Sequence, residues 1–548
     1  MYGSTAQPLS LIEILKGELD REFGIMKAKA DPAPYFMAYE ATETESDTAS
    51  ASLGALIDSL HIHSRGVDTT IRVGSPQFDN YHPYKGVRFR FTAYSPISLD
   101  NNADEIRRAL WRDSDRVYRA AVGRLLQLKT DEQLIAEDKE KSDDFSSEQP
   151  AGFANVPERY RTDMTEWTGR LRALSAEFKT HDRILASQVA FRAQREIRTL
   201  VNSEGTQIEQ GSNLFRFEVG ADGLTPDGMD VSTFATVEAS DPAHMPGETQ
   251  LRAQVKDVAD KVDALMKAPP AEPIVCPAIL SGRAAAVFFH EIFGHRVEGH
   301  RQKDVEEGQT FTKMLGQQVL PAFISVRFDP TRRQFDGKDL IGYYEYDDEG
   351  VKARPVDVVE KGVLKTFLLS RSPVGEFAHS NGHGRKQPGF EPESRQSNLI
   401  VESTKQVSDT ELRAMLVAEV KKQVKPYGLY FEEVASGYTT TGRRGLQAFT
   451  VVPLVVYRVY PDGRPDELIR GVDIVGTPLS SFQRILATSN KSDVFNGYCG
   501  AESGSIPVSA VSPAILVSEI ETQKKRNAQR KAPILPRPGG STYHATFE

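Results

Sequence analysis

The chain has 548 residues, of which 39% are hydrophobic and 26% charged, and its formal net charge at pH 7 is −9. Its length exceeds one ordinary domain core and predicts two or three domains, and its composition is typical of a soluble globular protein. The acidic charge argues against a nucleic-acid-binding protein, and no segment approaches the ~20 apolar residues of a membrane-spanning helix.

The cysteine count and the first residues bear on the cellular compartment. Two cysteines, Cys276 and Cys499, are too few for a disulfide framework and suit a reducing environment. The N-terminus lacks a basic segment followed by an apolar core, so no signal peptide is visible. We therefore expect a cytoplasmic protein, although a trimmed mature chain that had been exported would look the same.

The first half of the chain mixes helical and strand patterns. Apolar residues recur at helical spacing over 9–23, 104–128 and 162–179. Strand-forming residues dominate 35–39, 52–59, 67–73, 88–94, 183–192, 195–202, 206–210 and 214–219. A hairpin turn is expected at Asn202-Ser203-Glu204-Gly205. These patterns predict a mixed α/β domain over residues 1–245.

One stretch of this half differs in composition. Residues 131–157 are rich in Glu, Asp, Lys and Ser and then in Pro and Gly, which is typical of an exposed or disordered loop. With the helical pattern before it, this stretch predicts a helical or disordered insertion near residues 103–160.

The second half begins with a long helical pattern over 246–266, closed by Pro269-Pro270. A buried strand at 274–279 and a helix at 282–299 follow. Short strands separated by Gly, Pro and Asp then dominate, with one helix at 410–424. We therefore predict an α+β protein whose second domain, 246–548, is mostly antiparallel β, barrel-like, and carries the helix at 282–299.

That helix contains two histidines around a carboxylate, in the stretch Phe289-His290-Glu291-Ile292-Phe293-Gly294-His295. It is similar to the H-E-x-x-H zinc motif, in which the histidines share a helix face. Here the step is one residue longer, so a regular helix would separate the two rings by roughly 140° rather than roughly 40°. A π-bulge would bring them together, and so would a distortion at Gly294, which we favour.

A catalytic zinc needs a third protein ligand and an open position for water. The candidates are His300, Glu298, His383 and Cys499. Cys499 lies in a predicted glycine-rich loop, Asn496-Gly497-Tyr498-Cys499-Gly500, where a ligand can approach closely. The alternative is that the histidines are hydrogen-bonded core residues and that the cysteine, like Cys276, is a small buried apolar residue.

Several ordered blocks together resemble the TldD/PmbA peptidases. The resemblance covers most of residues 180–520. It includes the histidine stretch with Val297-Glu298-Gly299, the blocks Tyr346–Val351 and Glu360–Leu364, Gly382-His383-Gly384-Arg385, and Cys499-Gly500 with Ile506-Pro507-Val508. Asn202-Ser203-Glu204-Gly205 is similar to the hairpin of the family's N-terminal domain.

The resemblance implies a zinc ion held by His290, His295 and Cys499. It also implies a dimer, with an identical chain or a PmbA-like subunit, that encloses a chamber where unfolded or extended peptide is cut. Because the histidine–glutamate motif is intact, the chain is similar to the catalytic, TldD-like subunit. It departs from the family at Ala501–Gly504 and at His300, which repeats the five-residue step and is an alternative or outer ligand.

Metal-assisted hydrolysis assigns a role to Glu291, which would accept the proton of the attacking water and pass it to the leaving amine. His383 and Arg385 are candidates for stabilising the oxyanion. Extended peptides would pair with a sheet edge. Two other functions stay open: a non-catalytic scaffold that partners a catalytic subunit, and an interaction protein of the DNA-gyrase-modulator type.

Overall fold

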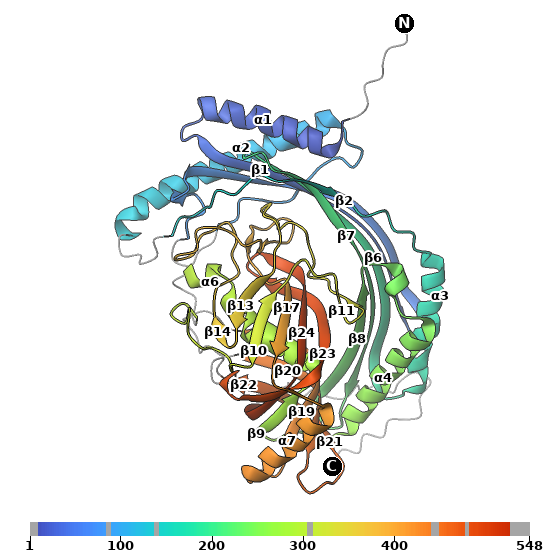
Figure 1. The fold of residues 1–548 in the computed structure, drawn as a ribbon. Coiled ribbons are helices and arrows are strands. Elements are labelled where there is room, and N and C mark those ends of the chain that lie inside the picture. The colour runs from blue at the N-terminus through green and yellow to red at the C-terminus, as the bar shows by residue number, and fades with distance from the viewer. Residues whose placement is uncertain are drawn as a thin grey trace.

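The computed structural model describes residues 9–83, 89–135, 142–303, 311–439, 449–476 and 482–525. Figure 1 shows a long curved sheet from the first half of the chain wrapping around a β-rich second half. The predicted α+β class is confirmed. Within the described residues, no helix is both long and apolar enough to cross a membrane.

The curved sheet is built from very long antiparallel strands: β1 (Pro34–Ser52), β2 (Ala55–Ser75), β6 (Ile184–Asn202), β7 (Gln207–Leu224) and β8 (Asp230–Ala239). Its order is β3-β2-β1-β6-β7-β5, with β8 also paired to β7 and β4 to β2. The short members are β3 (Phe78–Asp79), β4 (Ser95–Pro96) and β5 (Gly152–Asn155).

Four helices cover the outer face of this sheet (Figure 1). They are α1 (Leu11–Lys29), α2 (Ala103–Ile135), α3 (Met164–Ser175) and α4 (Glu248–Lys267). The first two share a hydrophobic core with β1 and β2, and the last two share one with β6 and β7. The inner face is thereby left to meet the second half of the chain.

Two strand predictions in this half are wrong. Residues 52–59 contain a hairpin turn, since Leu53 and Gly54 both have positive φ, and long polar strands extend to either side of it. Residues 89–94 of the strand predicted at 88–94 form no strand, and residue 88 lies outside the described residues. The backbone N–H groups of Phe91 and Thr92 donate to the Glu391 carboxylate instead of to a neighbouring strand.

The prediction of an exposed loop over residues 131–157 is also wrong for part of that stretch. Helix α2 continues to Ile135, and 136–141 lie outside the described residues. Asp144, Phe145 and Ser146 are buried. The Ser146 N–H donates to the carbonyl of Arg371, whose guanidinium donates back to the Ser146 carbonyl at 3.0 Å. This segment therefore packs against the second half.

The second half contains a twelve-stranded sheet, part of which closes into a five-stranded barrel. The barrel strands are β9 (Ile274–Leu280), β19 (Gly428–Thr439), β20 (Phe449–Val459), β22 (Val472–Gly476) and β24 (Gly504–Lys524). Most pairings are antiparallel, but β9–β19, β17–β24 and β18–β23 are parallel. The predicted barrel-like second half is confirmed.

Shorter elements complete this half. The strands are β10 (Ile324–Phe328), β13 (Val356–Glu360), β14 (Val363–Leu364), β17 (Asn398–Ser403), β18 (Gln406–Val407), β21 (Glu467–Ile469) and β23 (Ile485–Ala501). Two small hairpins are β11 (Gln334–Phe335) with β12 (Lys338–Asp339) and β15 (Gly384–Arg385) with β16 (Glu393–Ser394). Helices α5 (Gly282–Ile292), α6 (His300–Lys303) and α7 (Asp409–Lys422) lie among them.

Candidate metal centre

The motif helix breaks where the sequence favours a break. Helix α5 begins at the N-cap Ser281 and ends at Ile292, and a 3₁₀ turn over Gly294–Val297 follows. A Cβ on residue 294 would lie 1.9 Å from Oε1 of Gln396, so only glycine fits. Gln396 also donates to the carbonyl of His290 at 3.2 Å and thereby holds the end of the helix. The expected distortion near Gly294 is confirmed.

Cys499 reaches the helix from a different element than expected. It lies on β23, opposite Ile506 of β24, so the predicted glycine-rich loop is in fact the end of a long hairpin strand. A Cβ on Gly497 would lie 2.8 Å from the ring of Phe495, whereas a Cβ on Gly500 would meet no atom within 4 Å.

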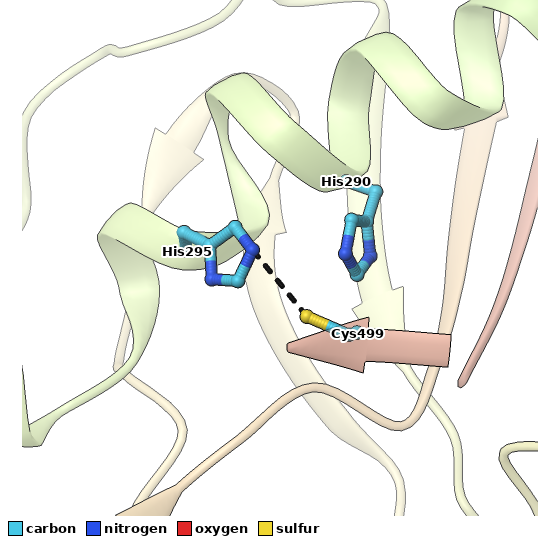
Figure 2. Close-up of side chains that lie close together, drawn as sticks. All are labelled: His290, His295 and Cys499. Atoms are coloured by element: carbon cyan, nitrogen blue, oxygen red, sulfur yellow. Dashed lines mark hydrogen bonds between the residues drawn. The ribbon is translucent and has the colours of Figure 1, made fainter. Parts of the chain in front are cut away.

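The three side chains point toward one another (Figure 2). His290 comes from α5, His295 from the 3₁₀ turn and Cys499 from β23. One ligand atom of each lies within 4.8 Å of the others, and Nε2 of His295 is 3.4 Å from the sulfur. The residues are only 4%, 6% and 5% exposed. A buried set of two imidazoles and one thiol converging on one point is a candidate metal site.

The electrostatics of the cluster favour a thiolate. Burial alone would raise the pKa of the Cys499 thiol, but the neighbouring His295 and His290 imidazoles hold it well below its ordinary value. Burial likewise opposes the charged form of His295, yet Cys499 and Glu298 raise its pKa well above the usual range. A thiolate is the form of cysteine that binds a metal.

A second layer of buried charges, largely missed from the sequence, orients the cluster. Glu298, considered as a ligand, instead lies 3.1 Å from Nδ1 of His295 and leaves Nε2 facing the sulfur. Arg395 donates to both the carbonyl and the sulfur of Cys499, at 2.7 and 3.2 Å. Arg301 donates to Glu298 at 2.9 Å. No local pattern marks Arg395, which lies far along the chain.

Glu291 lies beside the cluster in an open cleft of about 490 Å³. Its side chain is 12% exposed, and one of its carboxylate oxygens lies 3.8 Å from Nε2 of His295. A Cβ on Gly437 would lie 2.5 Å from Cγ of Glu291, so glycine makes room for this side chain. Arg216 and Phe234 of the curved sheet also line the cleft.

The remaining predicted site residues lie outside the cluster. Nδ1 of His300 lies 3.1 Å from the carbonyl of Ser394. His383 is fully buried beside Asn381 and Ser397, and burial lowers its pKa to about 3. Arg385 donates to the carbonyls of Gln396 and Pro507. Among the described residues that line the cleft, none of these three is present.

The second half of the chain matches a known protein domain. Residues 273–524 match the model of the PmbA/TldA metallopeptidase C-terminal domain. This part of the chain, slightly less than half of it, is similar to the C-terminal domain of the TldD/PmbA family.

Curated relatives are named as metalloproteases. This chain is 29% identical to "Metalloprotease MJ0996" of Methanocaldococcus jannaschii, over 44% of its own length and 50% of the relative's. It is 25% identical to "Zinc metalloprotease TldD homolog" of Saccharolobus solfataricus, over 45% and 51%. The chain thus spans about half the length of these relatives.

Solved structures share the fold over most of this chain. TldE of Thermococcus kodakarensis matches with a TM-score of 0.62 at 13% identity, over 93% of this chain and 100% of that one. A Thermotoga maritima protein described as a candidate modulator of a DNA gyrase matches with a TM-score of 0.61 at 15% identity, over 92% and 99%. At these identities the matches show the fold alone.

Proposed function

We propose that this chain is a zinc-dependent peptidase that hydrolyses unfolded or extended peptides, with His290, His295 and Cys499 as metal ligands. The observation that carries the proposal is the convergence of three buried donor atoms beside a carboxylate in an open cleft. Relatives named as metalloproteases, one of them a zinc metalloprotease, support it.

The residues present fit zinc. Two imidazoles and a thiolate are a donor set that zinc accepts in catalytic sites, with a fourth position left for water. Nδ1 of His290 is buried without a hydrogen-bond partner, which a ligand would supply. The Glu298 carboxylate on His295 is the outer partner that metal-binding histidines usually have. Zinc in such a site lowers the pKa of its bound water and polarises a carbonyl.

Glu291 is the proposed general base. It follows directly after His290 on α5, so its carboxylate faces the same cleft without belonging to the three-donor set. There Glu291 accepts a proton from the attacking water and returns it to the leaving amine. The buried apolar residues of α5 lower the local polarity on one side of the cleft and strengthen these interactions.

The peptide is proposed to bind along the end of β23. Residues 496–501 pair with β24 on one edge only, and within the described part of the chain no strand covers the other edge, which lines the cleft. An extended main chain can hydrogen-bond to such an edge whatever its side chains are. This geometry supports weak sequence preference and an unfolded substrate.

The intact ligand set and Glu291 favour the catalytic, TldD-like role over a non-catalytic scaffold, and no observation of the site favours a gyrase-modulator role. We further propose that the chain works as a dimer, with a second copy or a PmbA-like subunit, around a closed chamber. A cytoplasmic location and a boundary near residue 245 between two domains remain proposals from the sequence.

Metal analysis tests the proposal. The chain purified without chelators is expected to hold one zinc per chain, and Cys499→Ser is expected to hold at least tenfold less. Cys276→Ser, the only other cysteine substitution the chain allows, is the matched control and should keep the metal. A chain without zinc, or zinc unchanged in Cys499→Ser, would overturn the assignment.

Catalysis is tested separately with Glu291→Gln. This variant is expected to keep its zinc and to lose cleavage of an unfolded peptide by at least 100-fold, since general-base catalysis contributes that much. Cleavage at the wild-type rate would remove Glu291 from the mechanism.

A further inference from the structure

A second cavity lies between the curved sheet and loops of the second half. Its walls include Phe36 of β1, Leu200 of β6 and Phe145 of the buried segment, and on the other side Glu349 and Glu391. Its volume is about 180 Å³. An apolar cavity of about 150 Å³ holds one benzene molecule, so this cavity is sized for one side chain or a small organic ion.

The charges around this cavity are unbalanced. Among the described lining residues, eight carry carboxylates and five are Lys or Arg. Two of these cations pair with carboxylates outside the wall: Arg72 with Asp79 at 2.6 Å, and Arg371 with Glu204 at 2.8 Å. Most lining carboxylates nevertheless have a cation: Lys386 pairs with Glu40 and Asp68, and from outside the wall Arg198 pairs with Asp348 and Arg301 with Glu502. Within the described residues, Glu349 and Glu391 have no ion pair.

Buried polar atoms at the wall also lack hydrogen-bond partners. They include Oε1 of Glu40 and Nε2 of His300, in residues that are 5% and 4% exposed. Their nearest opposite charges, Arg198 at 3.5 Å and Glu502 at 3.7 Å, lie beyond good hydrogen-bond geometry. Burial raises the pKa of Glu40 and of Glu349 to about 7, and the nearby carboxylates Asp348 and Glu393 add to the two shifts respectively. A cation in the cavity would offset the repulsion among these buried carboxylates.

We infer that this cavity binds an alkylammonium or alkylguanidinium group, with the charge at the carboxylates and the apolar stem against Phe36, Phe145 and Leu200. Two sources offer this chemistry: a small free cation, or a Lys or Arg side chain of a bound peptide. Glu502 lines both this cavity and the metal cleft, so a peptide held at the cluster would lie next to the cavity. The peptide source rests on the proposed function, whereas the cation site does not.

Isothermal titration calorimetry on the full chain tests the site with n-butylguanidinium and its neutral counterpart n-pentanol. The cation is expected to bind at least tenfold more tightly than the alcohol. Equal binding, or binding of neither, would overturn the inference, and this comparison needs no variant.

Variants then locate the site. Glu349→Gln and Glu40→Gln are each expected to weaken n-butylguanidinium binding about tenfold, whereas Glu360→Gln, at an exposed carboxylate, should leave it unchanged. Wild-type binding in both cavity variants would overturn the inference. Two substitutions are used because Glu349 also accepts the Arg371 N–H, and its loss could unfold the chain.

The source is separated with two peptides that differ only in one lysine replaced by norleucine, bound to Cys499→Ser so that no cleavage occurs. If the lysine peptide binds more tightly than the norleucine peptide, and if adding Glu349→Gln abolishes that difference, the cavity binds a substrate side chain. Binding of the free cation alone, with equal peptide affinities, assigns it to a small molecule. Binding of the free cation does not depend on zinc or on peptide cleavage. The calorimetric test therefore stays valid if the peptidase proposal fails.

Discussion

At the scale of single residues, the outer partner of His295 decides how well the cluster is organised. Glu298 is fully buried, and His295, Arg301 and Arg395 surround it at 3.1, 2.9 and 3.4 Å. Its charge fixes which ring nitrogen of His295 faces the sulfur. Arg395 contacts Glu298 and also donates to the sulfur of Cys499, so it links the two. The cluster is therefore oriented by residues that do not belong to it.

Glu298→Gln is accordingly expected to lower zinc affinity by 10- to 100-fold, the usual cost of losing such a partner. The measurement is competitive titration with a zinc chelator. Glu360→Gln, an exposed change of the same kind, is the control. Unchanged affinity in Glu298→Gln would show that the carboxylate balances charge without orienting the ring.

At the scale of elements, the break between α5 and the 3₁₀ turn is what brings His295 to the side of His290. Gly294→Ala is expected to lower the free energy of unfolding by about 1–3 kcal/mol, because its Cβ would overlap Gln396. Chemical denaturation measures this cost. Gly169→Ala in α3, where a Cβ meets no atom within 4 Å, is the matched control and should be neutral or stabilising.

The same prediction has an internal check. If overlap is the cause, Gly294→Ala should cost much less in a Gln396→Ala background, since the overlapping atoms are then gone. An equal cost in both backgrounds would point to backbone conformation at residue 294 instead.

Helices and the second-half barrel could be predicted because their signals are local: apolar periodicity and turn residues. The predicted strands are shorter than the observed ones, because much of β1 and β2 consists of polar residues such as Ser, Thr and Glu. Those stretches show no alternation of apolar and polar residues that would mark a strand. The cluster could be predicted in part, from the five-residue step and from a resemblance. Arg395 could not, since only tertiary contacts bring it to Cys499.

At the scale of the whole molecule, one sheet edge is left open. Residues 55–64 of β2 pair with β1 on one side, and no strand of the described chain covers the other side. Ile57, Leu60 and Ile62 are 61%, 56% and 52% exposed there. An exposed apolar edge of this length is a template for another strand. Two copies of the chain present identical edges. Antiparallel pairing about a two-fold axis would therefore give the unpaired backbone N–H and C=O groups of both edges hydrogen-bond partners.

Leu60→Lys is therefore expected to dissociate the proposed dimer, because a charge on the edge opposes strand pairing. Light scattering after size exclusion should give twice the 60.7 kDa chain mass for the wild type and 60.7 kDa for the variant. Leu126→Lys, at a leucine that is 58% exposed on α2, is the control and should stay dimeric. A wild-type chain that is monomeric alone and dimeric only with a PmbA-like subunit would assign the edge to that partner. A dimer that survives in Leu60→Lys would place the interface elsewhere.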